Sequence, residues 1–300
     1  MSFDWYQASV QASQVGSREV VMWARGLGDE VREAPGLARM YRYGEAWRVY
    51  RDGVGPLCTV LGSADHGGSH VIASGEHAEP FARVFRSRFP EHQVTRADVA
   101  YDFFGGADYD RDRARLRVIA EAHRVSFLQI ADELDEGAGR TQYLGSPRSS
   151  ARVRFYEKGL EVQGAMRRQI AGGVPVTLVT EDGEIVEPSE WLRLECQVRP
   201  EKGEARQRLA SAEPREFWGC SPVLRAVFQE FFGGEVETCS IQVKRGKSEA
   251  EKALLLLCLQ YGRHLGRLLE GAGSDEAFGR LIREQLEAIA FAKRTGMVAV

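Results

Sequence analysis

Residues 191–199 read Trp191-Leu192-Arg193-Leu194-Glu195-Cys196-Gln197-Val198-Arg199, and from Leu192 onward apolar and polar side chains alternate. A period of two is typical of a β-strand with one face toward the core and the other toward solvent. Antiparallel sheets commonly have one solvated face, whereas parallel strands are usually buried on both faces. The stretch therefore predicts an antiparallel sheet with an apolar face and a polar face.

The chain on both sides of this strand predicts further elements in an irregular order. Before it we expect strands at 38–43, 47–51, 57–61, 94–104, 141–144 and 152–157, helices at 79–89 and 111–122, and a hairpin at 177–185 turning at Asp182-Gly183. After Pro200 we expect helices at 222–232, 248–269 and 274–295, with start signals at Ser221-Pro222 and at Ser248 and Glu251. Strands and helices do not alternate strictly. This predicts an α+β fold, with a mainly antiparallel sheet and packed helices in residues 1–205 and a helical C-terminal region in 206–300.

Composition limits the classes of function. The 300 residues carry a net charge of -3, with 43% hydrophobic and 28% charged residues, the balance of a soluble globular chain. The longest apolar run, 253–259, is far shorter than the ~18 residues of a membrane span, and the N-terminus has no signal-peptide features. Five scattered cysteines predict neither a disulfide framework nor a thiolate zinc site. We therefore expect a cytoplasmic protein with no membrane partner.

Several common catalytic motifs are absent from the sequence. It contains no GxxxxGK[ST], GxGxxG, GxSxG or HExxH motif, which argues against nucleotide hydrolysis, dinucleotide chemistry and the common hydrolase designs. No His-x-His pair occurs either. We interpret His66 and His70, around Gly67-Gly68, as polar loop residues.

The strand expected at 94–104 carries an unusual pair of acids. Its period of two places Arg96, Asp98, Ala100 and Asp102 on one face. Asp is disfavoured within strands, and a hard divalent cation with oxygen ligands is one reason to keep two of them. Ion pairing of Asp98 with Arg96 or with a neighbouring strand is the alternative.

The strand expected at 152–157 lies in a basic stretch. The same alternation aligns Arg152, Arg154, Tyr156 and Lys158, and residues 140–168 hold seven basic side chains against two acidic ones. A tyrosine among fixed cations is a candidate nucleophile toward phosphate, once its proton is removed. A surface strand with an amphipathic tyrosine is the alternative.

The alternation in residues 191–199 places Arg193, Glu195 and Arg199 on the polar face of that strand. Glu195 completes a carboxylate set with Asp98 and Asp102 if the strands that carry them are neighbours in the sheet. An ordinary solvated face is the alternative.

Together these stretches resemble the replication initiation factor family, whose members start rolling-circle replication in filamentous phages and small plasmids. The motifs are residues 95–102, then Tyr143-Leu144-Gly145-Ser146 with Ser149 and residues 154–161, then Arg193-Leu194-Glu195. The resemblance covers about residues 1–200 and marks 1–205 as a nicking domain. It implies that Tyr156 is the nicking nucleophile and that Asp98, Glu195 and Asp102 bind a metal.

Two residues depart from the family pattern. Pro147 stands where a basic residue is expected in the Gly-Ser-Arg form of the motif, and Glu157 replaces the commoner Asp. Arg148 is then the residue expected to supply the phosphate contact. The lack of a His-x-His pair also separates the chain from the rolling-circle nickases that bind their metal with two histidines.

The resemblance implies an enzyme that nicks and rejoins origin DNA through a 5′-phosphotyrosine intermediate. We expect Tyr156 and Lys158 to be catalytic, with Mg²⁺ or Mn²⁺ assisting. Five arginines are expected to contact DNA: Arg96, Arg148, Arg152, Arg154 and Arg199.

The expected substrate is origin DNA that enters as a single strand, in the cytoplasm of a bacterial host. A host helicase, a polymerase and a second copy of the chain are candidate partners. Two other functions stay open at this point: a DNA-binding regulator on the same scaffold, and a metal-dependent hydrolase that uses water in place of tyrosine.

Overall fold

The structure, a computed structural model, describes residues 1–11, 13, 15–51, 55–63, 68–132, 137, 139–169, 178–179, 183, 185–201, 203–241 and 249–295. The chain forms two compact units, Met1–Val243 and Lys244–Val300. In its described residues the second unit consists of helices α8 (Glu249–Ala272) and α9 (Asp275–Thr295). None of the described helices is long and apolar enough to cross a bilayer.

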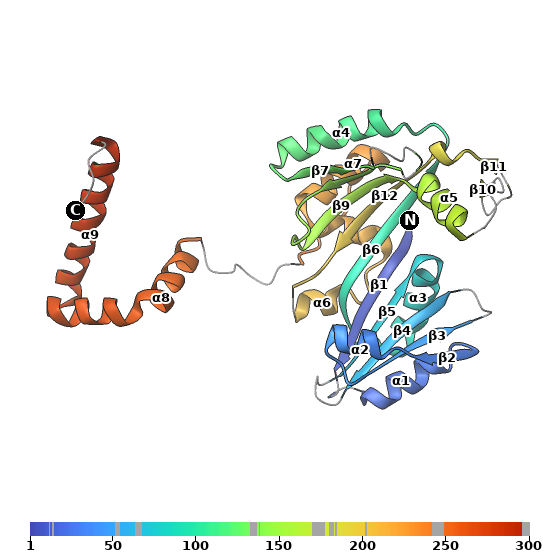
Figure 1. The fold of residues 1–300 in the computed structure, drawn as a ribbon, viewed down its shortest axis with the longest axis horizontal. Helices are drawn as coiled ribbons and strands as arrows, with labels where there is room; N and C mark the ends of the chain where they lie inside the picture. The colour runs from blue at the N-terminus through green and yellow to red at the C-terminus, as the bar shows by residue number, and fades with distance from the viewer. Residues whose placement is uncertain are drawn as a thin grey trace. The chain divides into compact units, whose positions relative to one another are not determined.

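Ten of the described strands form one sheet (Figure 1). Along the chain they are β1 (Ser2–Gln11), β2 (Glu30–Glu33), β3 (Glu45–Tyr50), β4 (Pro56–Ser63), β5 (Gly68–Ser74), β6 (Gln93–Phe104), β7 (Phe127–Ile130), β8 (Thr141–Leu144), β9 (Ala151–Glu157) and β12 (Trp191–Val198). Their order across the sheet is β2-β3-β4-β5-β1-β6-β12-β9-β8-β7, and all neighbours are antiparallel. Strands β10 (Leu178–Val179) and β11 (Ile185–Val186) pair separately. The predicted α+β class with a mainly antiparallel sheet is confirmed.

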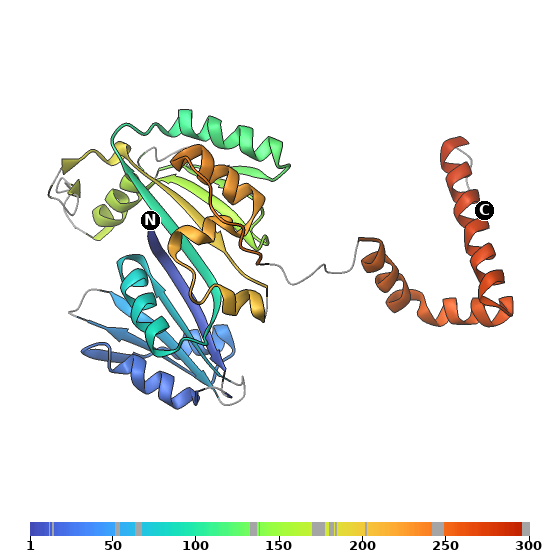
Figure 2. The same cartoon turned by 180° about the vertical axis from the view of Figure 1, so that it is seen from behind.

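Helices cover one face of this sheet and bury the core of the first unit. The covering elements are α1 (Ser17–Arg25), α3 (Ala78–Arg88), α4 (Tyr109–Ala122), the 3₁₀-helix η4 (Pro214–Cys220) and α7 (Pro222–Phe232). Phe85 of α3 and Trp218 of η4 lie in one buried cluster with Val99 of β6 and Leu194 of β12. Figure 2 shows α3, α7 and the short helix α6 (Glu204–Arg208) in front of the strands. Helices α2 (Pro35–Tyr41) and α5 (Lys158–Gln169) lie on the opposite side of the sheet (Figure 1).

Helix α7 illustrates how the sequence sets the limits of an element. Ser221 Oγ accepts a hydrogen bond from the Leu224 amide at 3.1 Å, and Pro222 occupies the first turn, where no amide proton is needed. Gly233 follows the last residue with φ 65°, a conformation that glycine adopts without steric cost. The predicted bounds 222–232 are confirmed.

Most of the other predicted elements are also observed. The strands predicted at 47–51, 57–61, 94–104, 141–144, 152–157 and 191–198 correspond to β3, β4, β6, β8, β9 and β12, and the helices at 79–89 and 111–122 to α3 and α4. The two C-terminal helices are α8 and α9. Ser274 Oγ accepts a hydrogen bond from the Ala277 amide at 3.2 Å at the start of α9. The signals at Ser248 and Asp182 lie outside the described residues.

Two predictions are wrong. Residues 38–43 do not form a strand, since Pro35 opens helix α2 and Arg42, with φ 60°, ends it. His70 is not a loop residue but a buried member of β5, where its Nε2 lies 2.7 Å from Gln7 Nε2 of β1. His66 and Gly67 lie outside the described residues. Strands β1, β2, β5 and β7 and helices α1, α5 and α6 were not predicted.

The two units divide later than the expected boundary at residue 205. Phe217, Trp218 and Leu224 are fully buried in the cluster that includes Leu194 of β12. Because this packing joins η4 and α7 to the sheet, the division falls between Val243 and Lys244.

Candidate active site on the open sheet face

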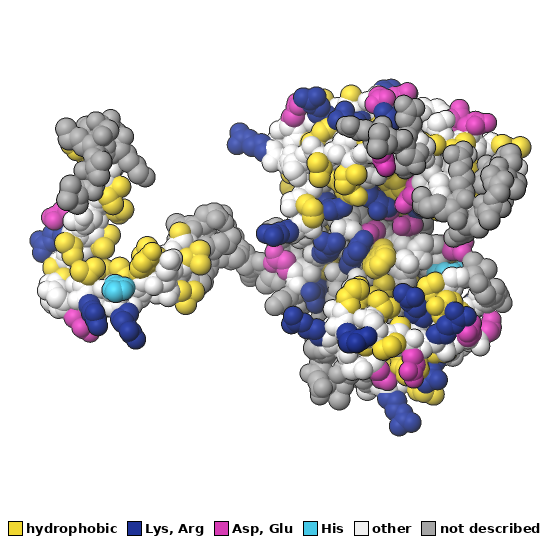
Figure 3. Space-filling model, in the orientation of Figure 1, with side chains coloured by type: hydrophobic (Ala, Val, Ile, Leu, Met, Phe, Trp, Pro, Cys, Tyr) yellow, Lys and Arg dark blue, Asp and Glu magenta, His cyan; other side chains and the backbone are white. Residues whose placement is uncertain are grey.

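The face of the sheet opposite the core stays polar over β6, β12 and β9. Its cross-strand rows are Tyr156–Arg193–Asp102, Arg154–Glu195–Ala100 and Arg152–Gln197–Asp98. We call the polar residues of these rows, together with Arg96 and Arg199, the open face. The strands that carry Asp98, Asp102 and Glu195 are therefore neighbours in the sheet, as the predicted carboxylate set requires. Figure 3 shows Lys and Arg side chains gathered across the middle of this side of the molecule.

Tyr156 is buried beneath cationic side chains. Its side chain is only 3% exposed, and among the described residues its hydroxyl has no hydrogen-bond partner. The Arg154 guanidinium carbon lies 4.2 Å from the centre of the tyrosine ring, and Lys158 Nζ lies 5.8 Å from it. Burial raises the pKa of the phenol well above its usual range, and the Glu195 carboxylate raises it further, while Arg154 and Arg193 lower it. In this state Tyr156 holds its proton.

The three predicted carboxylates each lie against an arginine. Glu195 Oε2 is 2.7 Å from Arg154 Nε, and Asp98 Oδ1 accepts a hydrogen bond from Arg96 Nε at 2.9 Å. Asp102 Oδ1 accepts one from Arg193 Nε at 2.7 Å. Burial raises the pKa of Glu195 to about 8, against the lowering effect of Arg154.

These carboxylates do not assemble a ready metal site. In the described part of the chain, no three His, Cys, Asp or Glu side chains form a group that could hold a metal ion. Gln197 Nε2 also donates to Asp98 Oδ2 at 3.1 Å, and Trp191 Nε1 donates to Asp102 Oδ1 at 2.7 Å. A metal would therefore need at least one arginine to leave its carboxylate.

One end of the open face carries cations that form no ion pair with the described residues. Among the described residues Arg152 and Arg199 have no ion-pair partner, and Arg148 lies exposed in the turn between β8 and β9. Arg152 lies over the Tyr143 ring at 4.3 Å, and Arg199 Nη1 donates to the Pro147 carbonyl at 2.9 Å. We call Arg148, Arg152 and Arg199 the cationic end. Three like charges at one place are suited to binding phosphate.

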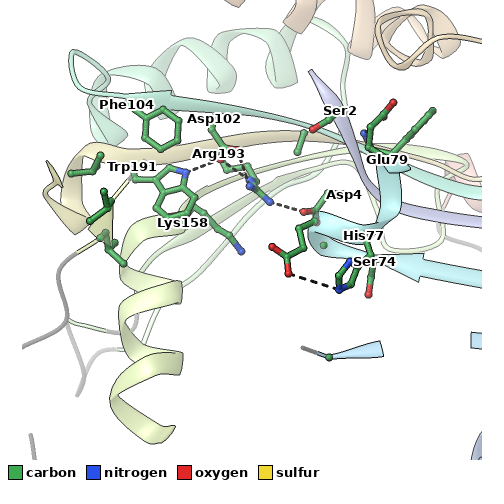
Figure 4. A pocket seen from close by; sticks show the side chains of 18 of the residues that line it. Ser2, Asp4, Ser74, His77, Glu79, Asp102, Phe104, Lys158, Trp191 and Arg193 are labelled. Carbon is green, nitrogen blue, oxygen red and sulfur yellow. Dashed lines mark hydrogen bonds and ion pairs between the residues drawn. The ribbon is translucent and has the colours of Figure 1, made fainter. Parts of the chain in front are cut away.

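The other end of the open face borders a cavity of about 1000 Å³. Asp102, Phe104, Trp191 and Arg193 line it from β6 and β12, and Lys158 lines it from the start of α5 (Figure 4). Asp4 of β1 lines it too, with Oδ1 2.6 Å from Arg193 Nη1.

Asp4 reaches this site because β1 is irregular. Its pairing with β6 shifts between Phe3 and Trp5, which leaves Asp4 as an extra residue in the strand. Such a bulge turns a side chain away from the regular alternation. Phe3 and Tyr6 are buried in the core, and Asp4 ion-pairs with Arg193 on the opposite face. Asp4 was not predicted as a site residue, because no strand was predicted over the residues of β1.

The structure brings nine of the ten predicted site residues onto or beside one sheet face, and Arg148 lies in the adjoining turn. Lys158 does not continue the strand alternation, because α5 begins at this residue. Arg193 and Trp191 were missed as site residues. The signal for Arg193 was its place on the same polar face as Glu195.

Comparisons with known proteins leave the function to be argued from this site. No family model matches the chain, and no curated protein matches it. The chain is similar to a solved structure described as a rolling circle replication initiator protein from Geobacillus stearothermophilus, with 20% sequence identity and a TM-score of 0.44. The similarity covers 83% of this chain and 89% of that one. Values this low carry no argument about function.

Proposed function

We propose that this chain nicks and rejoins DNA to start rolling-circle replication, with Tyr156 as the nucleophile. One observation carries the proposal: a buried tyrosine hydroxyl, without a hydrogen-bond partner among the described residues, lies beside Arg154 on an arginine-rich sheet face. Leaving a buried hydroxyl unpaired costs about 1–3 kcal/mol, so a ligand that contacts it is expected.

The proposed step exchanges one phosphoester for another. Tyr156 Oη attacks the phosphorus in line, its proton is lost, and the bond from phosphorus to the 3′ oxygen breaks. The 3′ oxygen takes up a proton, which leaves a 3′-hydroxyl for a polymerase and a 5′-phosphate bonded to Tyr156. The reverse attack by a 3′-hydroxyl rejoins the strand, because the phosphotyrosine conserves the bond energy.

The cations around Tyr156 favour this step. Arg154 and Arg193 lower the pKa of the phenol, although burial keeps it high before DNA binds. Lys158 Nζ is 5.8 Å from the ring centre and bonded to Glu161 Oε2 at 2.8 Å, close enough to turn toward a bound phosphate. Positive charge at the phosphoryl oxygens stabilises the transition state more than the ground state.

Metal assistance by Mg²⁺ or Mn²⁺ is part of the proposal, with Asp98, Glu195 and Asp102 as the candidate ligands. Mg²⁺ sites often use only one or two carboxylates together with water and substrate phosphate. A DNA phosphate that draws Arg154 or Arg96 to itself would free Glu195 or Asp98. The metal, when bound, would polarise the phosphoryl oxygen.

DNA is expected to lie across the open face as a single strand. Phosphates would contact the cationic end, Arg148, Arg152 and Arg199, together with Arg96 and Arg154. The other proposed partners are a host helicase, a polymerase and a second copy of the chain, in a bacterial cytoplasm.

A second candidate is a DNA-binding regulator that does no chemistry. The observation that favours it is the protonated, buried phenol of Tyr156 beside carboxylates that are already paired. In that case Tyr156 only contacts DNA.

Covalent capture separates the two candidates. The protein is mixed with a labelled pool of random single-stranded oligonucleotides and Mg²⁺ or Mn²⁺, then heated in detergent. Label that stays on wild-type protein but not on Tyr156→Phe supports the nicking enzyme. Label that binds under native conditions and is lost entirely on denaturation, for both proteins, overturns it in favour of the regulator.

A further inference from the structure

We infer that the cavity beside Tyr156 binds one unpaired base of the DNA strand, next to the phosphate that is cut. The inference rests on the proposed function and names how that site recognises its substrate. The cavity lies where β6 ends and β12 begins, beside β1 and the 3₁₀-helix η1 (Gly75–His77) (Figure 4). Its volume of about 1000 Å³ is at the upper limit of small-ligand sites, which span about 300–1,000 Å³.

Two aromatic rings form one wall of the cavity. Phe104 and Trp191 face each other across β6 and β12, with ring centres 5.4 Å apart and planes inclined by 41°. Phe104 is 48% exposed, which is unusual for a phenylalanine in a strand. Stacking on a base would cover this exposed ring, and bases of any identity stack on such rings.

The Trp191 ring is held in place. Its Nε1 donates to Asp102 Oδ1 at 2.7 Å, and the same oxygen accepts from Arg193 Nε at 2.7 Å. Arg193 Nη1 in turn lies 2.6 Å from Asp4 Oδ1. This chain of bonds fixes the ring before any ligand arrives, and a fixed surface loses less entropy on binding.

The charge of the lining favours a base over a phosphate. Besides His77, four acidic and two positively charged side chains line the cavity. They are Asp4, Glu76, Glu79 and Asp102, and Lys158 and Arg193. Arg193 already bonds Asp4 and Asp102, and Glu79 Oε2 accepts from the Phe3 amide at 3.0 Å. Glu76 has a largely exposed carboxylate, 3.8 Å from His77 Nε2. A carboxylate accepts hydrogen bonds from exocyclic amino groups, so cytosine, adenine and guanine suit this wall better than thymine.

Two residues that line the cavity lie next to the proposed nucleophile. Arg193 lines it and is the cross-strand neighbour of Tyr156, and Lys158 lines it and lies 5.8 Å from the Tyr156 ring centre. A strand with its phosphates on the cationic end and one phosphate at Tyr156 would therefore place an adjacent base here.

The test measures binding rather than cutting. All variants carry Tyr156→Phe, and anisotropy gives the Kd for labelled dC12, dA12 and dT12 across a salt series. Phe104→Leu removes the ring, Phe104→Tyr retains it, and Val118→Ala on α4 is the control, an exposed side chain (66%) away from the cavity. Thermal melting checks that each variant is folded.

We expect Phe104→Leu to weaken binding about fivefold or more with an unchanged salt slope, since stacking involves no counterion release. Phe104→Tyr and Val118→Ala should bind as the parent does. Glu76→Gln should reduce the preference for dC12 over dT12. A Phe104→Leu effect below twofold, or one equalled by Phe104→Tyr, overturns the base pocket.

The base pocket and the nicking function can fail separately. If wild-type protein captures no DNA covalently but Phe104→Leu weakens binding as expected, the nicking proposal fails and the pocket stands. If capture succeeds and Phe104→Leu binds normally, the pocket is wrong and the nicking proposal stands.

Discussion

The two faces of strand β12 are both buried, yet they are built by different rules. Leu194 and Cys196 on the core face contact apolar side chains from the covering helices. Glu195, between them in sequence, is 3% exposed and lies against Arg154. Burying an apolar side chain stabilises the fold. For a buried ion pair, the attraction between the two charges roughly offsets the cost of removing them from water, so the pair adds little net stability. The core face accounts for stability, and the open face for chemistry, and variants on each face can test this division.

The largest expected effect belongs to the open face and leaves stability unchanged. Tyr156→Phe should reduce covalent DNA capture by about 10³-fold or more, because the nucleophile is lost. The variant should melt at the same temperature as wild type or higher, since the missing hydroxyl had no partner among the described residues. Gel analysis of denatured complexes measures the first quantity and calorimetry the second. Capture at the wild-type rate would exclude Tyr156 as the nucleophile.

The matching change on the core face should show the reverse. Leu194→Ala is expected to lower the free energy of unfolding by about 2–5 kcal/mol, because it leaves a cavity in a fully buried cluster. Any folded fraction should still capture DNA. Urea denaturation provides the measurement, with Gln197→Ala on the opposite face as the comparison. A loss of equal size from both variants would contradict the division between the faces.

Loss of the metal is expected to slow the chemistry of the open face and to leave the core face unchanged. Chelation, or Asp98→Asn, should slow nicking about 100-fold while the arginines keep their hold on DNA. Mg²⁺ or Mn²⁺ should restore the chelated wild type but not the variant. Capture rates with and without chelator are compared alongside binding. Full-rate nicking in excess chelator would remove the metal from the mechanism.

Arginines at the cationic end should contribute to DNA affinity but not to the stability of the fold. Arg152→Ala combined with Arg199→Ala should reduce the slope of log K against log salt by about 1.4, at about 0.7 for each lost contact with a single-strand phosphate. Arg83→Ala with Arg117→Ala, on helices α3 and α4, is the matched control of equal charge loss. Filter binding across a salt series gives both slopes. Equal slopes in the two double variants would show that DNA does not bind at this end.

The smallest expected effect is a pH dependence of stability. Burial raises the pKa of Glu195 to about 8, above its unfolded value, so the folded state holds this proton more tightly. The resulting stabilisation is complete below the unfolded pKa of about 4.3 and is lost as pH rises through about 8. Glu195→Gln should remove that decline, so the variant should lose less stability than wild type as pH rises from 5 to 9. Melting curves from pH 5 to 9 test this, and parallel profiles for both proteins would contradict it.

The sequence predicted those strands, and those side-chain faces, in which apolar and polar residues alternate regularly. Strands β6, β9 and β12 alternate cleanly, so the residues that share a face within each strand, such as Asp98 and Asp102, were visible in the residue order. The order of strands was not, because pairings such as Tyr156 with Arg193 join residues far apart in the chain. The bulge at Asp4 breaks the alternation of β1, and this concealed both the strand and the acid.

The place of β1 in the sheet has a consequence for biosynthesis. Strand β1 is synthesised before both of its partners, β5 and β6, and lies between them near the middle of the sheet. Its partners include residues as distant as Ala100, so Phe3 and Tyr6 stay without their core contacts until that part of the chain has been made. Pairings over such separations slow folding and prolong the exposure of apolar side chains. Strand β1 is thus a part of the sheet that needs protection until β5 and β6 have been synthesised.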